Sequence, residues 1–164
     1  RWTETVEDAF KEVRSRWTDE QAAGRSAFVY ATTNDSVDRL NTELRQARID
    51  LGQVSRECER TFATEKGERR TQTTVSPGDR IQFHATVKDR AEGLELHNGT
   101  FGTILGIEGD RLRVHMDDGR LVAFDPAQRR GWGLGYAGTT YKGQGKTNEA
   151  TILFYDNARA WSSR

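Results

Sequence analysis

The segment 27-AFVYATTNDSVDRL-40 decides the fold class of this chain, because it reads as a strand that runs directly into a helix. Residues 27–33 form a short β-prone run, and 34-NDS-36 supplies side chains that can cap a helix. The apolar positions that follow share one helical face, at Val37, Leu40, Leu44 and Ala47. A strand followed by a helix predicts an α/β layer with a parallel sheet, in which loops at the carboxyl ends of strands carry function. Asn34 lies at such an end.

Two flanking segments extend this layer. Residues 3–17 place four apolar side chains on one face at helical spacing, at Val6, Phe10, Val13 and Trp17. Thr5 and Asp8 form a capping-box-like start for this helix. Near the other end of the chain, the apolar run 151-TILFY-155 predicts one more strand of the same sheet.

The middle of the chain has a different pattern, with short alternating or β-branched runs that predict strands at 80-RIQFHATV-87, 100-TFGTILGI-107, 111-RLRVHMD-117 and 120-RLVAFD-125. Tight-turn sequences separate them, at 77-PGD-79, 109-GD-110 and 117-DDG-119. Strands at this spacing predict a small closed or nearly closed barrel. We therefore expect an α/β domain over 1–70, an inserted barrel over 71–126 and a return to the first domain over 127–164. The polar stretch 65-EKGERRTQ-72 is expected to be an exposed junction.

Length and composition limit the function classes. The chain has 164 residues, enough for one core plus a small inserted module. Lys and Arg balance Asp and Glu at 25 each, so any nucleic-acid site must be local. Cys58 is the only cysteine, which excludes an internal disulfide. Without a run of about 18 apolar residues or a leader, we expect a soluble protein, and the single cysteine fits a reducing compartment such as the cytoplasm. A start at Arg1 rather than methionine indicates a piece of a longer chain.

The stretch 138-GTTYKGQGKT-147 ends as a phosphate-binding P-loop does. A P-loop also needs a glycine five residues before Gly145, and that position is Thr140. It should follow a buried strand, whereas 131-GWGLGYAG-138 is too glycine-rich for a core strand. An ATP site formed by this stretch alone is therefore not expected.

The same region has the strongest local bias in the chain, because no acidic residue lies between Pro126 and Asn148. Its four cations and three aromatic residues are Arg129, Arg130, Lys142, Lys146, Trp132, Tyr136 and Tyr141. Cations that neutralise phosphates and rings that stack on bases are the combination that holds single-stranded nucleic acid. The alternative is a solvated basic loop whose aromatic side chains pack into the domain. The interspersed glycines fit either close approach to a ligand or a flexible loop.

No metal or catalytic site is predicted. His84, His97 and His115 have no cysteine, histidine or carboxylate neighbours at metal-ligand spacing. The pair Asp117-Asp118 precedes a glycine between two predicted strands, which is typical of a hairpin turn.

Three segments resemble the helicase region of TraA-type conjugative relaxases, in the RecD-like branch of superfamily 1 DNA helicases. They are 28-FVYATTNDSVDRLN-41, residues 77–120 and 135-GYAGTTYKGQGKT-147. The most specific runs are 97-HNGTFGT-103 and 136-YAGTTYKGQG-145, and the resemblance covers nearly the whole chain.

The resemblance implies roles for named residues. The last segment resembles motif V, with Tyr141 in place of the usual histidine, and implies DNA contact by Thr139, Tyr141 and Lys142 beside the basic and aromatic Arg129, Arg130 and Trp132. It also implies coupling to the nucleotide by Gln144, Gly145 and Lys146. Residues 30–41 resemble motif IV, which lies near the nucleotide cleft and matches here at Thr33, Asn34 and Asn41.

The implied fold is a partial RecA-like domain, 2A, interrupted by an SH3-like barrel, 2B. The implied function is that of a monomeric fragment of an ATP-dependent helicase for conjugative plasmid transfer that binds single-stranded DNA. ATP and Mg²⁺ would be bound only in the full-length parent, with its first RecA-like domain, because this chain lacks a Walker A cradle, an acidic Walker B pair and the arginine-bearing motif. The alternative is a non-catalytic module whose barrel binds protein partners.

Overall fold

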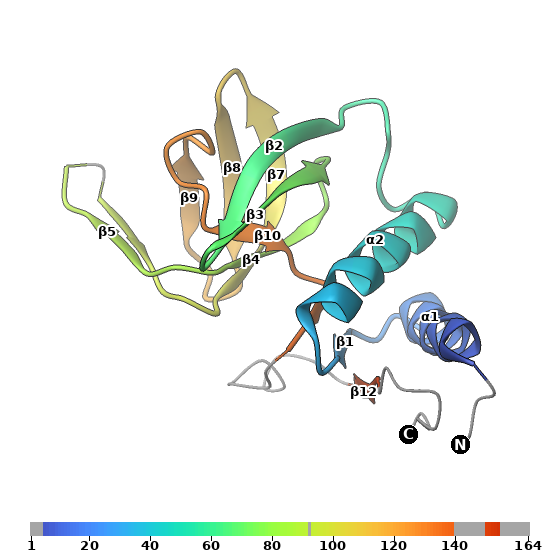
Figure 1. Ribbon diagram of the computed structural model, residues 1–164. Helices are drawn as coiled ribbons and strands as arrows, with labels where there is room; N and C mark the ends of the chain where they lie inside the picture. The colour runs from blue at the N-terminus through green and yellow to red at the C-terminus, as the bar shows by residue number, and fades with distance from the viewer. Residues whose placement is uncertain (1–4, 92, 140–149, 155–164) are drawn as a thin grey trace. The chain divides into compact units, whose positions relative to one another are not determined.

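The computed structural model describes residues 5–91, 93–139 and 150–154, and its chain divides into two compact units (Figure 1). The first unit contains residues 1–50 and 136–164, and the second contains residues 51–135. The second unit is therefore inserted in the first. Its limits are wider at both ends than the range of 71–126 expected for the insertion.

The first unit is built on a parallel three-stranded sheet, in the order β11-β1-β12. Strand β1 (Ala27–Tyr30) pairs with β11 (Ala137–Gly138) on one side and with β12 (Ala150–Leu153) on the other, both in parallel. The α/β class with a parallel sheet is thus confirmed, and so is the added strand near residue 151.

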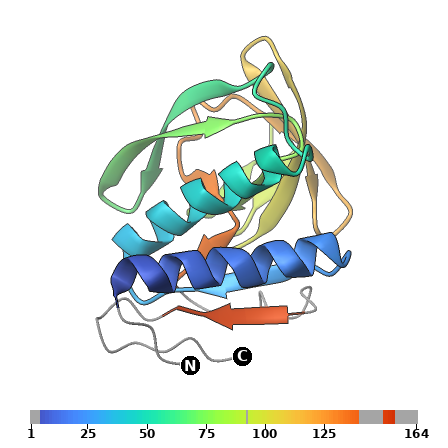
Figure 2. The same cartoon turned by 90° about the vertical axis from the view of Figure 1, so that its right-hand side faces the viewer.

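Two helices pack on this sheet. Helix α1 (Val6–Ala22) contacts β1 and β12, α2 (Asn34–Asp50) contacts β11, and the helices lie side by side (Figure 2). Thr5 caps α1 as expected, because its hydroxyl accepts a hydrogen bond from the Asp8 amide at 3.0 Å. The cap of α2 is Thr33, not 34-NDS-36, because the Thr33 hydroxyl accepts from the Ser36 amide at 3.2 Å. Neither helix combines the length and hydropathy needed to cross a membrane.

The second unit is all-β. Its strands are β2 (Arg60–Lys66), β3 (Arg69–Val75), β4 (Arg80–Phe83), β5 (Val87–Asp89), β6 (Leu94–Leu96), β7 (Phe101–Glu108), β8 (Arg111–Met116), β9 (Leu121–Phe124) and β10 (Trp132–Leu134). Five of them form one antiparallel sheet in the order β10-β4-β7-β8-β9, and β2-β3 and β5-β6 are separate hairpins. Within the described residues no ladder joins β9 to β10, so of the expected closed or nearly closed barrel the closed form is not found. The apolar runs indicate where several strands lie, but closure depends on tilt and stagger that strand spacing does not encode.

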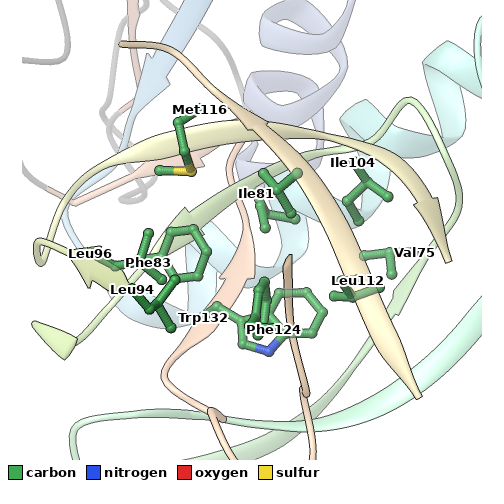
Figure 3. Packing of buried hydrophobic residues seen from close by; sticks show 11 residues of the cluster. Val75, Ile81, Phe83, Leu94, Leu96, Ile104, Leu112, Met116, Phe124 and Trp132 are labelled. Carbon is green, nitrogen blue, oxygen red and sulfur yellow. The ribbon is translucent and has the colours of Figure 1, made fainter. Parts of the chain in front are cut away.

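The core of the second unit is a cluster of buried apolar side chains on the inner faces of these strands (Figure 3). Two aromatic contacts centre on Phe124, whose ring centroid lies 5.4 Å from that of Phe83 and 6.1 Å from that of Trp132. The three expected tight turns are confirmed at their glycines, since Gly78, Gly109 and Gly119 all have positive φ. The turn sequences therefore determine where this unit reverses direction.

The polar stretch expected to be a junction forms the end of the β2-β3 hairpin instead. Seven residue pairs join β2 to β3, from Arg60 with Val75 to Lys66 with Arg69. Thr64 and Thr73 are buried and share a hydrogen bond of 2.7 Å between their hydroxyls. Because this inward-facing pair is polar, the hairpin lacks the apolar alternation that predicts a strand.

The glycine-rich stretch 131-GWGLGYAG-138 also differs from expectation, because it forms β10 and β11 and is largely buried. A β-carbon on Gly135 would lie 2.8 Å from the carbonyl carbon of Ile81, and one on Gly131 would lie 2.9 Å from the β-carbon of Ala85. These two glycines therefore allow close packing against the chain itself. Neither of the functions considered from sequence, ligand approach or flexibility, is needed to explain them.

We expect Gly102→Ala to destabilise the second unit by about 1–3 kcal/mol through overpacking. Its new β-carbon would lie 2.6 Å from Cγ1 of the core residue Val114. Gly106→Ala in the same strand is the matched control, because its β-carbon would meet only the Arg113 guanidinium, at 3.8 Å. Urea unfolding monitored by tryptophan fluorescence measures both variants, and equal stabilities would contradict the packing role of Gly102.

Candidate nucleic-acid interface

The carboxyl ends of the parallel strands bring two predicted segments together. Strands β1 and β11 run in the same direction and are adjacent, so the residues that follow them leave the sheet at the same edge. The Ala31 amide donates to the Gly138 carbonyl at 3.0 Å, which continues the pairing to that edge. Thr33 and Asn34 are exposed there, and Thr139 is partly exposed. The edge therefore joins the motif IV segment to the start of the motif V segment.

The first turn of α2 forms one side of this edge. The carbonyl and the hydroxyl of Thr33 accept hydrogen bonds from the amides of Val37 and Ser36, so Thr33 is occupied as the helix cap. Asn34 is the first helical residue, at the end of a 17-residue helix where the backbone amides and the helix dipole favour negative groups. Asp35 in the same turn places a carboxylate at this end. Of the two motif IV residues here, Asn34 has the more accessible position for a contact.

Asn41 has a different environment from the other two motif IV residues, because it is only 6% exposed. Its Oδ1 accepts hydrogen bonds from the amides of Tyr136 and Ala137, both at 2.8 Å, and its Nδ2 donates to the Ala137 carbonyl at 3.4 Å. Strand β11 is at the edge of the sheet, so the side-chain amide binds Ala137 as a peptide group of a further strand would. Asn41 thus holds the strand and is not directed at a ligand.

Tyr136 is the residue at which the chain returns to the first unit, and it is only 3% exposed. Its hydroxyl accepts a hydrogen bond from Nη1 of Arg48 at 3.1 Å. The Trp17 ring meets the Tyr136 ring edge-on, with 5.8 Å between centroids. Tyr136 therefore packs into its own domain, as the alternative reading of the basic, aromatic stretch expects.

Three predicted DNA-contacting residues belong to the second unit, whereas Thr139 belongs to the first. Trp132 is 1% exposed and belongs to the core, so base stacking by its ring is corrected to a packing role. Arg129 forms an ion pair with Asp89, which compensates its charge. Arg130 is exposed, and its Nε donates to the Ala127 carbonyl at 3.1 Å. Arg130 is thus the most accessible of the three cationic and aromatic side chains.

The remaining predicted contacts lie outside the described residues. These are the DNA-contacting Tyr141 and Lys142 and the coupling residues Gln144, Gly145 and Lys146. Their roles stay predictions.

The described residues contain no group of His, Cys, Asp and Glu side chains that could hold a metal ion. Asp117 in the predicted turn pairs with Arg80, with Nη1 and Oδ1 2.6 Å apart. Burial, together with the nearby charge of Lys66, lowers the pKa of His84 from 6.5 to about 4. His84 is therefore neutral at pH 7 and packs in the second unit.

Sequence reasoning did not identify Arg48 or the structural role of Asn41. A signal was present, because Asn41 and Arg48 follow Val37 and Leu44 by four residues each and so adjoin the apolar face of α2. A polar residue that adjoins an apolar helical face indicates a specific partner, but the sequence does not say which one.

We expect Asn41→Ala to lower the free energy of unfolding by about 2–4 kcal/mol, because two buried amides lose their acceptor. Thr42→Ala is the control on the same helix, since Thr42 is exposed and its hydroxyl bonds only the Asp38 carbonyl. Chemical denaturation of the two variants measures the difference. A loss for Asn41→Ala no larger than that for Thr42→Ala would show that these hydrogen bonds contribute little.

His84 predicts a pH dependence of stability. Its pKa is lower in the folded chain than in the unfolded chain, so the unfolded state binds the proton first as the pH falls. Stability is therefore fully present above pH 6.5 and declines toward pH 4, by roughly 3 kcal/mol. His84→Gln should remove this part of the decline. The check is to measure the free energy of unfolding of the original chain and of His84→Gln between pH 4 and pH 7. Parallel curves for the two proteins would show that His84 does not cause the decline.

Comparisons with known proteins identify the fold. No protein-family model matches the chain, and no curated protein matches it. Among solved structures, it is similar to one described as two coordinating Pif1 helicases unwinding forked double-stranded DNA, with a TM-score of 0.54 and 19% identity over 78% of this chain and 32% of that chain. It is also similar to Bacteroides Pif1 bound to single-stranded DNA (TM-score 0.53, 18% identity, 77% of this chain and 34% of that chain).

A third similar structure is Bacteroides Pif1 helicase in complex with ADP-AlF3 and single-stranded DNA (TM-score 0.52, 19% identity, 77% of this chain and 34% of that chain). The chain spans about a third of the length of these proteins. At these identities the likeness establishes the fold alone. The chain thus has the fold of part of these Pif1 structures, an α/β unit with an all-β insertion.

Proposed function

We propose that this chain is the second motor domain of an ATP-dependent DNA helicase for conjugative plasmid transfer, of the TraA type, and that it contacts single-stranded DNA. The observation that carries the proposal is the shared carboxyl edge of β1 and β11. At this edge the motif IV residues Thr33 and Asn34 leave the sheet beside Thr139 of the motif V segment. In open α/β sheets this edge is where ligands bind.

The DNA contacts follow from the resemblance and from accessibility. Thr139, Tyr141 and Lys142 contact the DNA backbone, since hydroxyl and ammonium groups bind phosphates without reading sequence. Arg130 supplies an additional exposed cation. Arg129 contributes less, because Asp89 already compensates its charge.

The coupling residues divide into two groups. Asn34, beside Thr33 at the first turn of α2, and the segment with Gln144, Gly145 and Lys146 respond to the nucleotide. Asn41 transmits the response, because α2 links the edge to the backbone of β11.

The first unit is the RecA-like domain 2A and the second is the SH3-like module 2B of the same helicase. ATP and Mg²⁺ are bound in the full-length parent, between this domain and its first RecA-like domain, in the bacterial cytoplasm. The described residues fit only part of such a site, since they hold no cluster of acidic side chains for the cation. We expect the isolated chain to be monomeric and, because its sequence has no Walker A cradle and no Walker B acidic pair, not to hydrolyse ATP alone.

A second candidate is a non-catalytic module in which the all-β unit binds a protein. Two large apolar side chains favour it, because Leu105 is 45% exposed and Leu121 is 69% exposed on this unit. Such a module would not bind DNA with strong salt dependence.

Fluorescence anisotropy with labelled oligonucleotides tests the proposal. We expect single strands to bind more tightly than duplexes, with affinity that falls as salt rises. Lys142→Ala should weaken binding and reduce the slope of log affinity against log salt by about 0.7, the value for one phosphate contact on a single strand.

Lys88→Ala is the matched control, because Lys88 is an exposed lysine on β5 of the second unit. The affinity of the Lys88→Ala variant for single strands should stay close to that of the unchanged chain. Equal losses for the two lysines would indicate a nonspecific charge effect, and no binding at low salt would favour the protein-binding candidate.

A further inference from the structure

Strand β11 is short, and its ladder with β1 provides little to hold it. Only two residue pairs join the strands, Val29 with Ala137 and Tyr30 with Gly138. At the start of β11, the Val29 amide lies 3.5 Å from the Tyr136 carbonyl, near the limit for a hydrogen bond. The ladder with β1 therefore leaves room for further contacts, from the other side of the strand, to fix where it begins.

Helix α2 supplies those contacts. The 2.8 Å bonds from the amides of Tyr136 and Ala137 to Oδ1 of Asn41 are much shorter than the contact between Val29 and Tyr136. Asn41 is buried, so water does not replace these bonds when they break. Seven residues later on the same helix, Arg48 donates to the Tyr136 hydroxyl. Helix α2 thus holds both the backbone and the side chain of Tyr136, the residue at which the chain returns to the first unit.

The chemistry of the group at position 41 is restricted. A carboxamide offers an acceptor that can take two amide protons and a donor for the Ala137 carbonyl. A carboxylate of the same size would place its second oxygen against that carbonyl, and leucine would fill the volume without any hydrogen bond. Asparagine therefore satisfies all three backbone groups with one side chain.

We propose that Asn41 is a positioning residue, which fixes where the chain re-enters the parallel sheet and so where Thr139 leaves it. The effect on DNA binding rests on the function proposed above. The positioning of β11 does not, since it concerns hydrogen bonds within the first unit.

The experiment uses the full chain with three variants. Asn41→Leu removes the hydrogen bonds and keeps the branched shape in a slightly larger side chain, and Asn41→Ala removes both the hydrogen bonds and the branched shape. Val13→Ala is the control for general destabilisation, because Val13 is fully buried on α1 and its side chain forms no hydrogen bond. Amide hydrogen exchange at Tyr136 and Ala137 is measured by NMR, and single-strand affinity by anisotropy, under conditions where every variant remains folded.

We expect the amides of Tyr136 and Ala137 to exchange faster than those of the core strand β1 in both Asn41 variants. In Val13→Ala they should exchange in step with β1. Single-strand affinity should fall by about tenfold in the Asn41 variants, as the DNA-contacting segment starts from a displaced strand, and by less than about twofold in Val13→Ala.

The proposal is overturned if the two amides exchange in step with β1 in the Asn41 variants. It is also overturned if Asn41→Leu and Val13→Ala lose single-strand affinity equally. Where the unchanged chain binds no single strand at all, the proposed function fails, and the exchange rates at Tyr136 and Ala137 still decide the role of Asn41.

Discussion

The parallel sheet depends on strands that come from far along the chain. Both neighbours of β1 follow the inserted unit, and β1 itself precedes it. Bringing such distant segments together costs loop-closure entropy, which grows only slowly with length. An 85-residue unit can thus interrupt the domain at moderate cost, provided that it folds by itself and that the returning chain is held where it re-enters. The contacts of α2 with Tyr136 and Ala137 meet the second condition.

The inserted unit is constrained in a different way, by close approach of main chains. In β10 and the residues around it, glycine is required where a β-carbon would collide with Ile81 or Ala85. The same stretch looks like a flexible, basic loop in the sequence. Its buried glycines and Trp132 show that composition alone does not distinguish a loop from a tightly packed strand. Protein interiors are packed so densely that a glycine at a buried position can indicate close contact with a neighbouring segment of chain.

Much of the fold could be predicted from the sequence, and what could be predicted is local. The strand and helix of 27–50, the cap at Thr5 and the turn glycines all depend on residues within a few positions of one another. The β2-β3 hairpin was missed because its buried pair, Thr64 and Thr73, is polar. The sequence left open whether the sheet closes, because closure depends on strand stagger. Asn41 was identified as a residue of interest, but its partner lies 96 positions away and no local rule identifies it.

The carboxamide of Asn41 also determines where this sheet can grow. An exposed edge strand offers unpaired N–H and C=O groups to any passing strand, and proteins commonly cover such edges. At Ala137 both groups are already taken by Asn41, so a strand that added beside β11 would first have to displace a buried side chain. The far side of β12 has no such cover among the described residues. The side chain that holds the start of β11 therefore also protects the β11 edge of the sheet from strand addition.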